Sequence, residues 1–141
     1  MRLIKRMNIL FICKHNRFRS KVAEALFKKY NKNTNVRAYS AGLIIGGTGH
    51  RHIAQAARHF GITITSKQQS ITKELLDAMD IIVDVADDVP STIFKQYLTP
   101  RKKLLVWNIE DFTGEGIEPR KKIMIKILSR VQKLISEVSK K

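Results

Sequence analysis

The sequence has little of what several protein classes depend on. Its 141 residues include one cysteine, Cys13, which excludes an internal disulfide and any zinc site that needs two or more thiolates. With three prolines and seven glycines, the chain is not collagen-like. No apolar run approaches the roughly 20 residues that cross a bilayer, and charges return too early near the start for a signal peptide. We therefore expect a soluble, cytoplasmic protein that makes no contact with a membrane.

Acidic residues are scarce as well. Twelve Asp and Glu stand against 27 Lys and Arg, which gives a formal net charge of +15. Residues 1–32 carry ten basic residues and one acidic residue, residues 119–141 carry eight and one, and residues 81–118 hold seven of the acids. This imbalance could attract nucleic acid, or it could reflect a solvated lysine-rich face that also steers anionic substrates. Because no nucleic-acid motif accompanies the basic residues, we expect no nucleic-acid partner.

The rest of the composition is that of an ordinary globular protein. Hydrophobic residues make up 43% and charged residues 28%, enough for a core that needs no metal or disulfide to stabilise it. His50, His52 and His59 come without a matching set of metal ligands and are expected to face solvent. We expect residues 1–141 to form a single monomeric domain that binds no metal and no cofactor.

Short apolar runs alternate with segments of helical periodicity along the chain. The runs predict strands over residues 8–12, 36–40, 81–85 and 104–107, and the periodic segments predict helices over residues 22–30, 53–60, 72–79 and 91–98 and from Pro119 onward. Gly61 is placed to end the second helix, Thr72 to cap the third and Pro90 to begin the fourth. This alternation predicts an α/β fold, a single doubly wound domain with a four-stranded parallel sheet and helices on both faces.

The segment after the first predicted strand carries the chemistry. Cys13 ends the strand, and the chain then continues into the first helix through Lys14, His15, Asn16, Arg17, Phe18, Arg19 and Ser20. In doubly wound sheets, ligands bind at the carboxyl ends of strands, where backbone N–H groups and a helix N-terminus together attract an anion. Residues 14–20 are therefore expected to form a phosphate-binding loop with Cys13 at its base.

Three residues of this segment have the types that a phosphoryl-transfer site needs. The amides and the helix dipole that bind the anion also stabilise Cys13 as a thiolate, which makes it a nucleophile. The Arg19 guanidinium can hold two phosphate oxygens at once, and the Ser20 hydroxyl can donate a hydrogen bond to the sulfur when the intermediate breaks down. The alternative is that Cys13 is a small buried apolar residue at the end of a strand.

The pattern Cys13-x5-Arg19-Ser20 after an apolar strand, with Asn16 inside the loop, resembles the low-molecular-weight protein tyrosine phosphatases. That family shares its fold with the thioredoxin-coupled arsenate reductases. Segments 40–42, 61–62, 71–74 and 80–83 also fall at matching places, so the resemblance covers nearly the whole chain. It implies a cysteine-dependent phosphomonoester hydrolase that acts through a phosphocysteine intermediate on phosphotyrosyl proteins or small aryl phosphates.

The family also requires a general acid on a late loop, normally an Asp followed by Pro. Asp111 takes that position here and is followed by Phe112. A carboxylic acid there can protonate the leaving oxygen and then, as a carboxylate, deprotonate the water of the second step. Glu110 is the rival acid, Asp84 and Asp87 are more distant ones, and the alternative is a merely solvated acidic loop.

Other residues match or depart from the family around the loop. The polar network that supports the loop in the family is matched by Asn16, Ser20 and Ser40. Phe18 stands where relatives often have a second cysteine, and Ser66 stands where they commonly have a histidine in that network. The aromatic residues that flank the ring of phosphotyrosine are absent from residues 43–48, and Phe112 could stack on the ring instead.

Two other functions are open on the same fold. An arsenate reductase would need an external thiol, because the thioredoxin-coupled form uses further cysteines that this chain lacks. A non-catalytic phosphate-binding or nucleic-acid-binding module would use the net charge of +15 without turnover. Hydrolysis of an aryl phosphate by the wild type and not by Cys13→Ser distinguishes an enzyme from such a module.

Overall fold

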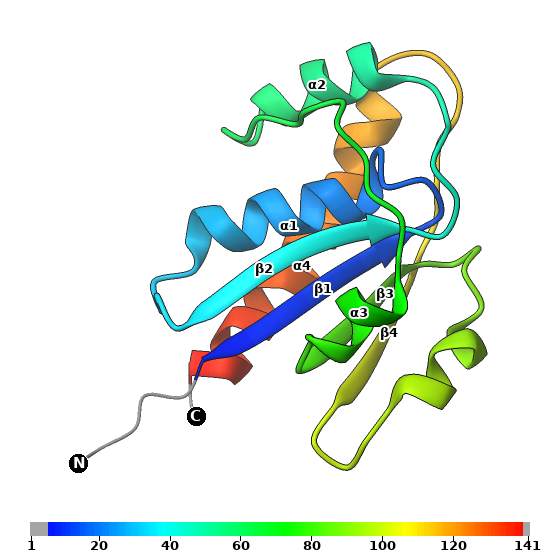
Figure 1. Ribbon diagram of the computed structural model, residues 1–141. Helices are drawn as coiled ribbons and strands as arrows, with labels where there is room; N and C mark the ends of the chain where they lie inside the picture. Colours follow the sequence, from blue (N-terminus) through cyan, green and yellow to red (C-terminus); the bar gives the residue numbers. More distant parts are fainter. Residues whose placement is uncertain (1–5, 140–141) are drawn as a thin grey trace.

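The structure, a computed structural model, describes residues 6–139. The first five residues, part of the segment for which no signal peptide is expected, lie outside this range. Four parallel strands form one sheet in the order β2-β1-β3-β4 (Figure 1). The strands are β1 (Met7–Cys13), β2 (Val36–Gly42), β3 (Ile81–Ala86) and β4 (Lys103–Ile109). Because β1 lies between β2 and β3, the crossovers run in opposite directions from it, which places a ligand-binding crevice at the carboxyl ends of β1 and β3.

Helices cover both faces of the sheet, as the sequence predicts. One face packs against α1 (Arg19–Tyr30), α2 (His50–Arg58) and α4 (Glu118–Ser139), and the other against α3 (Lys73–Asp77) and the 3-10 helix η1 (Ser91–Tyr97). Alternate residues of β1 serve the two cores: Phe11 belongs to the first and Ile12 to the second. The α/β fold with a four-stranded parallel sheet is therefore confirmed.

Two predicted elements differ in detail. The segment after Pro90 forms a 3-10 helix rather than an α-helix, and no side chain caps its start. The fourth strand runs to Ile109 instead of ending at Trp107, and it contains a bulge, because the register with β3 shifts and Asn108 has a φ of 53°. The bulge matters for the site, because the Ile109 carbonyl that follows it enters the crevice.

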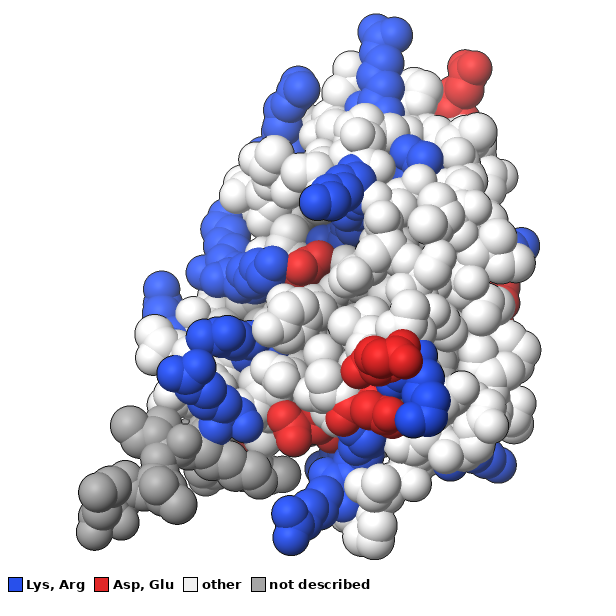
Figure 2. Space-filling view, in the orientation of Figure 1, with Lys and Arg blue, Asp and Glu red and all other residues white. Residues whose placement is uncertain are grey.

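Other local predictions hold. The Thr72 side chain accepts a hydrogen bond from the Leu75 N–H at 3.0 Å and so caps α3. Gly61 has a φ of 69° in the turn that follows α2. No helix among residues 6–139 is long and apolar enough to cross a membrane. Basic side chains outnumber acidic ones over the visible face of the molecule (Figure 2).

Candidate active site

The cysteine loop, residues 13–20, begins at the end of β1 and leads into α1. Its backbone turns at Asn16, whose φ of 54° lies in the left-handed region that asparagine tolerates. The loop packs directly on the end of β2, where a Cβ on Gly42 would lie 2.6 Å from the Asn16 backbone nitrogen. Only glycine at position 42 permits this contact, so β2 fixes the position of the loop.

A network of polar side chains lies behind the loop, and it reaches the Glu24 carboxylate, which accepts from Ser40 Oγ at 2.6 Å. Asn16 Nδ2 donates to Ser20 Oγ at 2.9 Å and to Ser40 Oγ at 3.0 Å, and Asn16 Oδ1 accepts the Gln69 N–H at 2.9 Å. Cys13 Sγ lies 3.0 Å from Ser20 Oγ. Since Ser20 Oγ accepts from Asn16, its own proton is free to point to the sulfur. The predicted supporting residues are thus brought together around the thiol.

The network differs from the prediction at one place. Ser66 is exposed and forms no hydrogen bond that would join it to this network. Gln69 lies there instead: its backbone N–H binds Asn16, and its Nε2 donates to the Ser40 carbonyl at 2.9 Å. The sequence motif therefore predicted the wrong partner for the network, Ser66 in place of Gln69. A backbone N–H can be supplied by any residue type, so the contact of Gln69 with Asn16 leaves no signal in the sequence.

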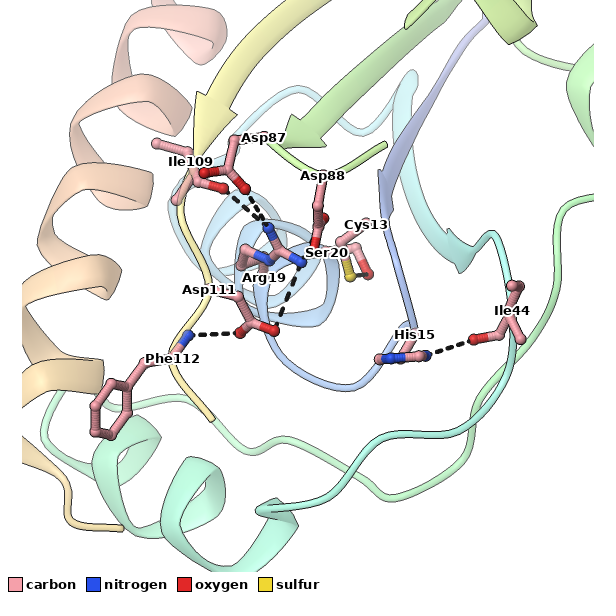
Figure 3. A network of polar contacts seen from close by, with 10 residues as sticks. All are labelled: Cys13, His15, Arg19, Ser20, Ile44, Asp87, Asp88, Ile109, Asp111 and Phe112. Atoms are coloured by element: carbon pink, nitrogen blue, oxygen red, sulfur yellow. Dashed lines mark hydrogen bonds and ion pairs between the residues drawn. The ribbon is translucent and has the colours of Figure 1, made fainter. Parts of the chain in front are cut away.

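Arg19 occupies the centre of the crevice and is only 2% exposed (Figure 3). Its Nη1 donates to the Ile109 carbonyl at 2.9 Å and lies 3.4 Å from Asp87 Oδ1. Its Nη2 lies 2.8 Å from Asp88 Oδ1 and 3.7 Å from Asp111 Oδ2. Nε takes part in none of these contacts. The ends of β3 and β4 therefore orient the guanidinium and leave one edge of it for another ligand.

A cavity of about 370 Å³ lies above Cys13 and beside Arg19. It is lined by Cys13, Lys14, His15, Arg17, Phe18, Arg19, Gly47, Thr48, Asp88, Asp111, Phe112 and Thr113. Among the expected loop residues, Asn16 and Ser20 do not line the cavity, and their side chains lie in the network behind it. Cys13 is 2% exposed, so its sulfur is reached only through this cavity.

The four candidate acids are placed very differently. Asp111 lines the cavity, with Oδ1 accepting the Phe112 N–H at 2.8 Å. Glu110 pairs with Lys126 on α4, which lowers the pKa of Glu110 and keeps its side chain out of the cavity lining. Asp87 contacts Arg19. Asp84 is completely buried in β3, and burial raises its pKa to about 7.

Hydrogen bonds join the rim of the cavity, at His15 and Arg17, to the loop after β2. His15 Nδ1 donates to the Ile44 carbonyl at 2.8 Å, and Arg17 Nε donates to the Gly46 carbonyl at 2.9 Å. Gln68 Oε1 accepts from Arg17 Nη2 at 3.0 Å, while its Nε2 donates to the carbonyls of His15 and Gly46. Neither Gln68 nor Asp88 was predicted from the sequence. Asp88 could have been, because it lies just after the carboxyl end of β3, where ligands bind in such sheets.

This arrangement can bind an anion and attack it from below. A thiol at the base of the cavity, a guanidinium beside it and a carboxyl above it are the groups that transfer of a phosphoryl group to sulfur requires. The residues 6–139 contain no group of three or more His, Cys, Asp or Glu side chains that could hold a metal ion.

Comparison with known proteins agrees with this chemistry. The family model described as low molecular weight phosphotyrosine protein phosphatase matches residues 8–141. A curated relative, the protein-arginine-phosphatase of Bacillus subtilis, is 29% identical over 121 residues, which cover 80% of this chain and 79% of the relative.

Two solved structures illustrate what the fold can carry. A low molecular weight protein tyrosine phosphatase from T. tengcongensis is 25% identical, with a TM-score of 0.79 over 93% of this chain and 99% of the other. An arsenate reductase from Archaeoglobus fulgidus is 28% identical, with a TM-score of 0.73 over 91% of this chain and 98% of the other. The fold by itself therefore does not select the substrate.

Proposed function

The chain belongs to the low molecular weight phosphotyrosine protein phosphatase family and is a cysteine-dependent phosphatase, and we propose that it hydrolyses phosphotyrosine in proteins, with Cys13, Arg19 and Asp111 as its catalytic residues. The observation that carries this assignment is the convergence of the three side chains on one cavity from the ends of β1, β4 and the start of α1. No other described cavity contains a cysteine, since Cys13 is the only one in the chain.

In the first step, the Cys13 thiolate attacks phosphorus and the bond from phosphorus to the phenolic oxygen breaks. Arg19 holds equatorial oxygens of the phosphoryl group through Nε and Nη2, the edge that faces away from the Ile109 carbonyl. Asp111 gives its proton to the departing phenolic oxygen. The products of this step are the phenol and a phosphocysteine.

In the second step, a water molecule attacks the phosphocysteine. The Asp111 carboxylate takes the proton of this water, and the bond between sulfur and phosphorus breaks to release phosphate. The sulfur leaves as a thiolate, and the Ser20 hydroxyl, 3.0 Å from it, donates a hydrogen bond to the new negative charge. Because Asn16 already donates to Ser20 Oγ, the hydroxyl proton points to the sulfur without rearrangement.

The charges around the cavity favour phosphotyrosine over phosphoarginine. Lys14, His15 and Arg17 line the cavity, and a substrate guanidinium would meet these basic groups on its way to Cys13. The two carboxylates of the lining, Asp88 and Asp111, both face Arg19. An uncharged aryl group meets no such repulsion.

The proposed compartment is the cytoplasm. The single cysteine must stay reduced to react, and the cytoplasm keeps thiols reduced.

Two peptides of identical sequence, one with phosphotyrosine and one with phosphoarginine, test this assignment. We expect kcat/KM to be at least about tenfold higher for the phosphotyrosyl peptide, since an added charge repulsion of about 1.4 kcal/mol suffices for that ratio. We expect Cys13→Ser to hydrolyse neither peptide, because a serine hydroxyl stays protonated in the same place, while phosphate binding is retained.

The outcomes separate the substrate from the mechanism. A preference for the phosphoarginyl peptide would overturn the substrate assignment and leave the mechanism in place. Turnover by Cys13→Ser comparable to the wild type would overturn the mechanism. Rapid acid quenching followed by mass spectrometry of the Cys13 peptide should show an added phosphate during turnover.

A further inference from the structure

Arg120 lies in the first turn of α4 and is almost completely buried, with 1% of its surface exposed. Within residues 6–139 it forms no ion pair, and its Nε has no hydrogen-bond partner. A buried guanidinium without a carboxylate in contact is unfavourable, and an unbranched apolar side chain would fill similar space without that cost. The contacts that only a guanidinium can make are therefore informative.

Those contacts join Arg120 to the acid loop, residues 110–117, which links β4 to α4 and carries Asp111. Arg120 Nη1 donates to the Gly116 carbonyl at 2.8 Å. The guanidinium carbon lies 5.0 Å from the centroid of the Phe112 ring, within the range of a cation–π interaction. The acid loop contains two glycines and no proline, so its own backbone is not stiff.

The space around Arg120 is shaped for it. A Cβ on Gly49, the residue before α2, would lie 2.7 Å from Arg120 Nη2, so a larger residue there would displace the guanidinium. Burial lowers the pKa of Arg120, and the negative charge of Asp111 partly offsets this effect. Arg120 therefore lies between α2 and the acid loop and within the field of the Asp111 carboxylate.

We propose that Arg120 is a positioning residue that holds Phe112 and thereby orients the Asp111 carboxyl over the cysteine loop, an inference that rests on the proposed role of Asp111 as the general acid. The Phe112 N–H donates to Asp111 Oδ1 at 2.8 Å, which leaves Oδ2 to face Arg19 (Figure 3). The Phe112 ring points away from Cys13 and Arg19. Arg120 binds the far side of the same residue whose backbone orients the acid.

The test compares aryl phosphates whose leaving groups differ in their need for a proton. We expect Arg120→Met to lower kcat/KM about tenfold on phenyl phosphate and less than about threefold on 2,4-dinitrophenyl phosphate, because kcat/KM reports formation of the phosphocysteine, in which only the poor leaving group depends on the acid. Arg120→Lys should fall between, since it keeps the charge and loses the planar group. Arg130→Met, at an exposed position of the same helix, is the matched control and should behave as the wild type.

A double-mutant comparison distinguishes positioning from general destabilisation. In an Asp111→Asn background, Arg120→Met should cause no further loss on phenyl phosphate, because the group it positions is gone. Phe112→Leu, which retains an apolar side chain and removes the ring, should reproduce the pattern of Arg120→Met. This variant also tests the proposal if Arg120→Met does not fold.

Three results would overturn the inference: equal losses on all substrates, additive losses with Asp111→Asn, or wild-type kinetics for Arg120→Met. The proposed function fails separately and visibly. If the wild type hydrolyses no aryl phosphate, or if Asp111→Asn alone shows no dependence on the leaving group, the role of Asp111 is wrong before any Arg120 variant is measured.

Discussion

Behind the cysteine loop, Asn16 joins the neutral hydroxyls of Ser20 and Ser40 through hydrogen bonds of 2.9 and 3.0 Å. In front of the loop, a single buried guanidinium, that of Arg19, lies 2.8 to 3.7 Å from three carboxylates at the ends of β3 and β4. The first group is complete without a ligand, because the Ser40 hydroxyl donates to Glu24 Oε1 at 2.6 Å and the Ser20 hydroxyl lies 3.0 Å from the Cys13 sulfur. The second group must share the charge of Arg19 with a phosphate when one binds.

This difference separates two kinds of contribution. A polar network that is satisfied in the free protein stabilises the fold and holds the sulfur in place, so its loss should affect the free energy of unfolding as well as turnover. A charged group that changes partners during binding acts chiefly on the transition state. Variants in the two groups should therefore differ in the ratio of their effects on kcat/KM and on stability.

The largest effect is expected for Arg19→Lys. A lysine ammonium is a point charge and cannot hold two phosphoryl oxygens in the plane that Arg19 provides. We expect kcat/KM on an aryl phosphate to fall by about 10³-fold, the upper range for loss of one transition-state donor. Arg37→Lys, at an exposed position of β2, is the control and should leave kcat/KM unchanged. Near wild-type kinetics for Arg19→Lys would place the phosphate elsewhere.

The same contrast explains how much of the site the sequence predicts. The cysteine loop is contiguous, so its spacing alone brings Cys13, Arg19 and Ser20 together, and the predicted strand and helix on either side of it are confirmed. The charged group is assembled from separate strand ends. Its geometry depends on the bulge at Asn108, which turns the Ile109 carbonyl toward Arg19 and has no signature in an apolar run.

A smaller loss of turnover, accompanied by a loss of stability, is expected for Asn16→Asp. The new carboxylate can still accept the Gln69 N–H, but it cannot donate to Ser20 or Ser40, and the Ser20 proton then turns from the sulfur to the carboxylate. We expect kcat to fall about tenfold and the free energy of unfolding to fall by about 2 kcal/mol, the scale of leaving a buried polar group without its partner. Steady-state kinetics measure kcat, and urea denaturation measures the free energy of unfolding.

Asn33→Asp provides the control for this change. Asn33 Oδ1 also accepts a backbone N–H, from Asn35 at 3.0 Å, and an aspartate preserves that bond. Neither stability nor kcat should change much. If Asn16→Asp loses turnover and keeps its full stability, then the network behind the loop acts on the transition state as the charged group does, and the contrast between the two groups is wrong.

The smallest effect on turnover is expected at Asp84, a carboxyl in the middle of β3 that the proposed mechanism does not use. Asp84 is 0% exposed, and within residues 6–139 no neighbour meets the full geometry of a hydrogen bond to either of its oxygens, so burial raises its pKa to about 7. The Ala86 amide and the charge of Arg19 offset only part of this rise, and the charge of Asp88 adds to it. The folded protein thus binds a proton here that the unfolded chain releases near its ordinary pKa of 3.8.

The direction of the pH dependence follows from that difference. Between about pH 4 and pH 7 the folded state holds more protons at Asp84 than the unfolded state, so the free energy of unfolding should decrease as the pH rises through this window and level off above it. Asp84→Val removes the titrating group from a strand that is otherwise apolar. Measured by urea denaturation, the variant should gain on the wild type by up to about 4 kcal/mol between pH 4 and pH 8. Asp77→Asn, which changes a carboxyl that is 49% exposed, should not show this divergence. Parallel stability curves for Asp84→Val and the wild type would mean that Asp84 is ionised in the fold and held by Arg19. Asp84 would then be the fourth carboxylate of the charged group and not a buried, protonated carboxyl beside it.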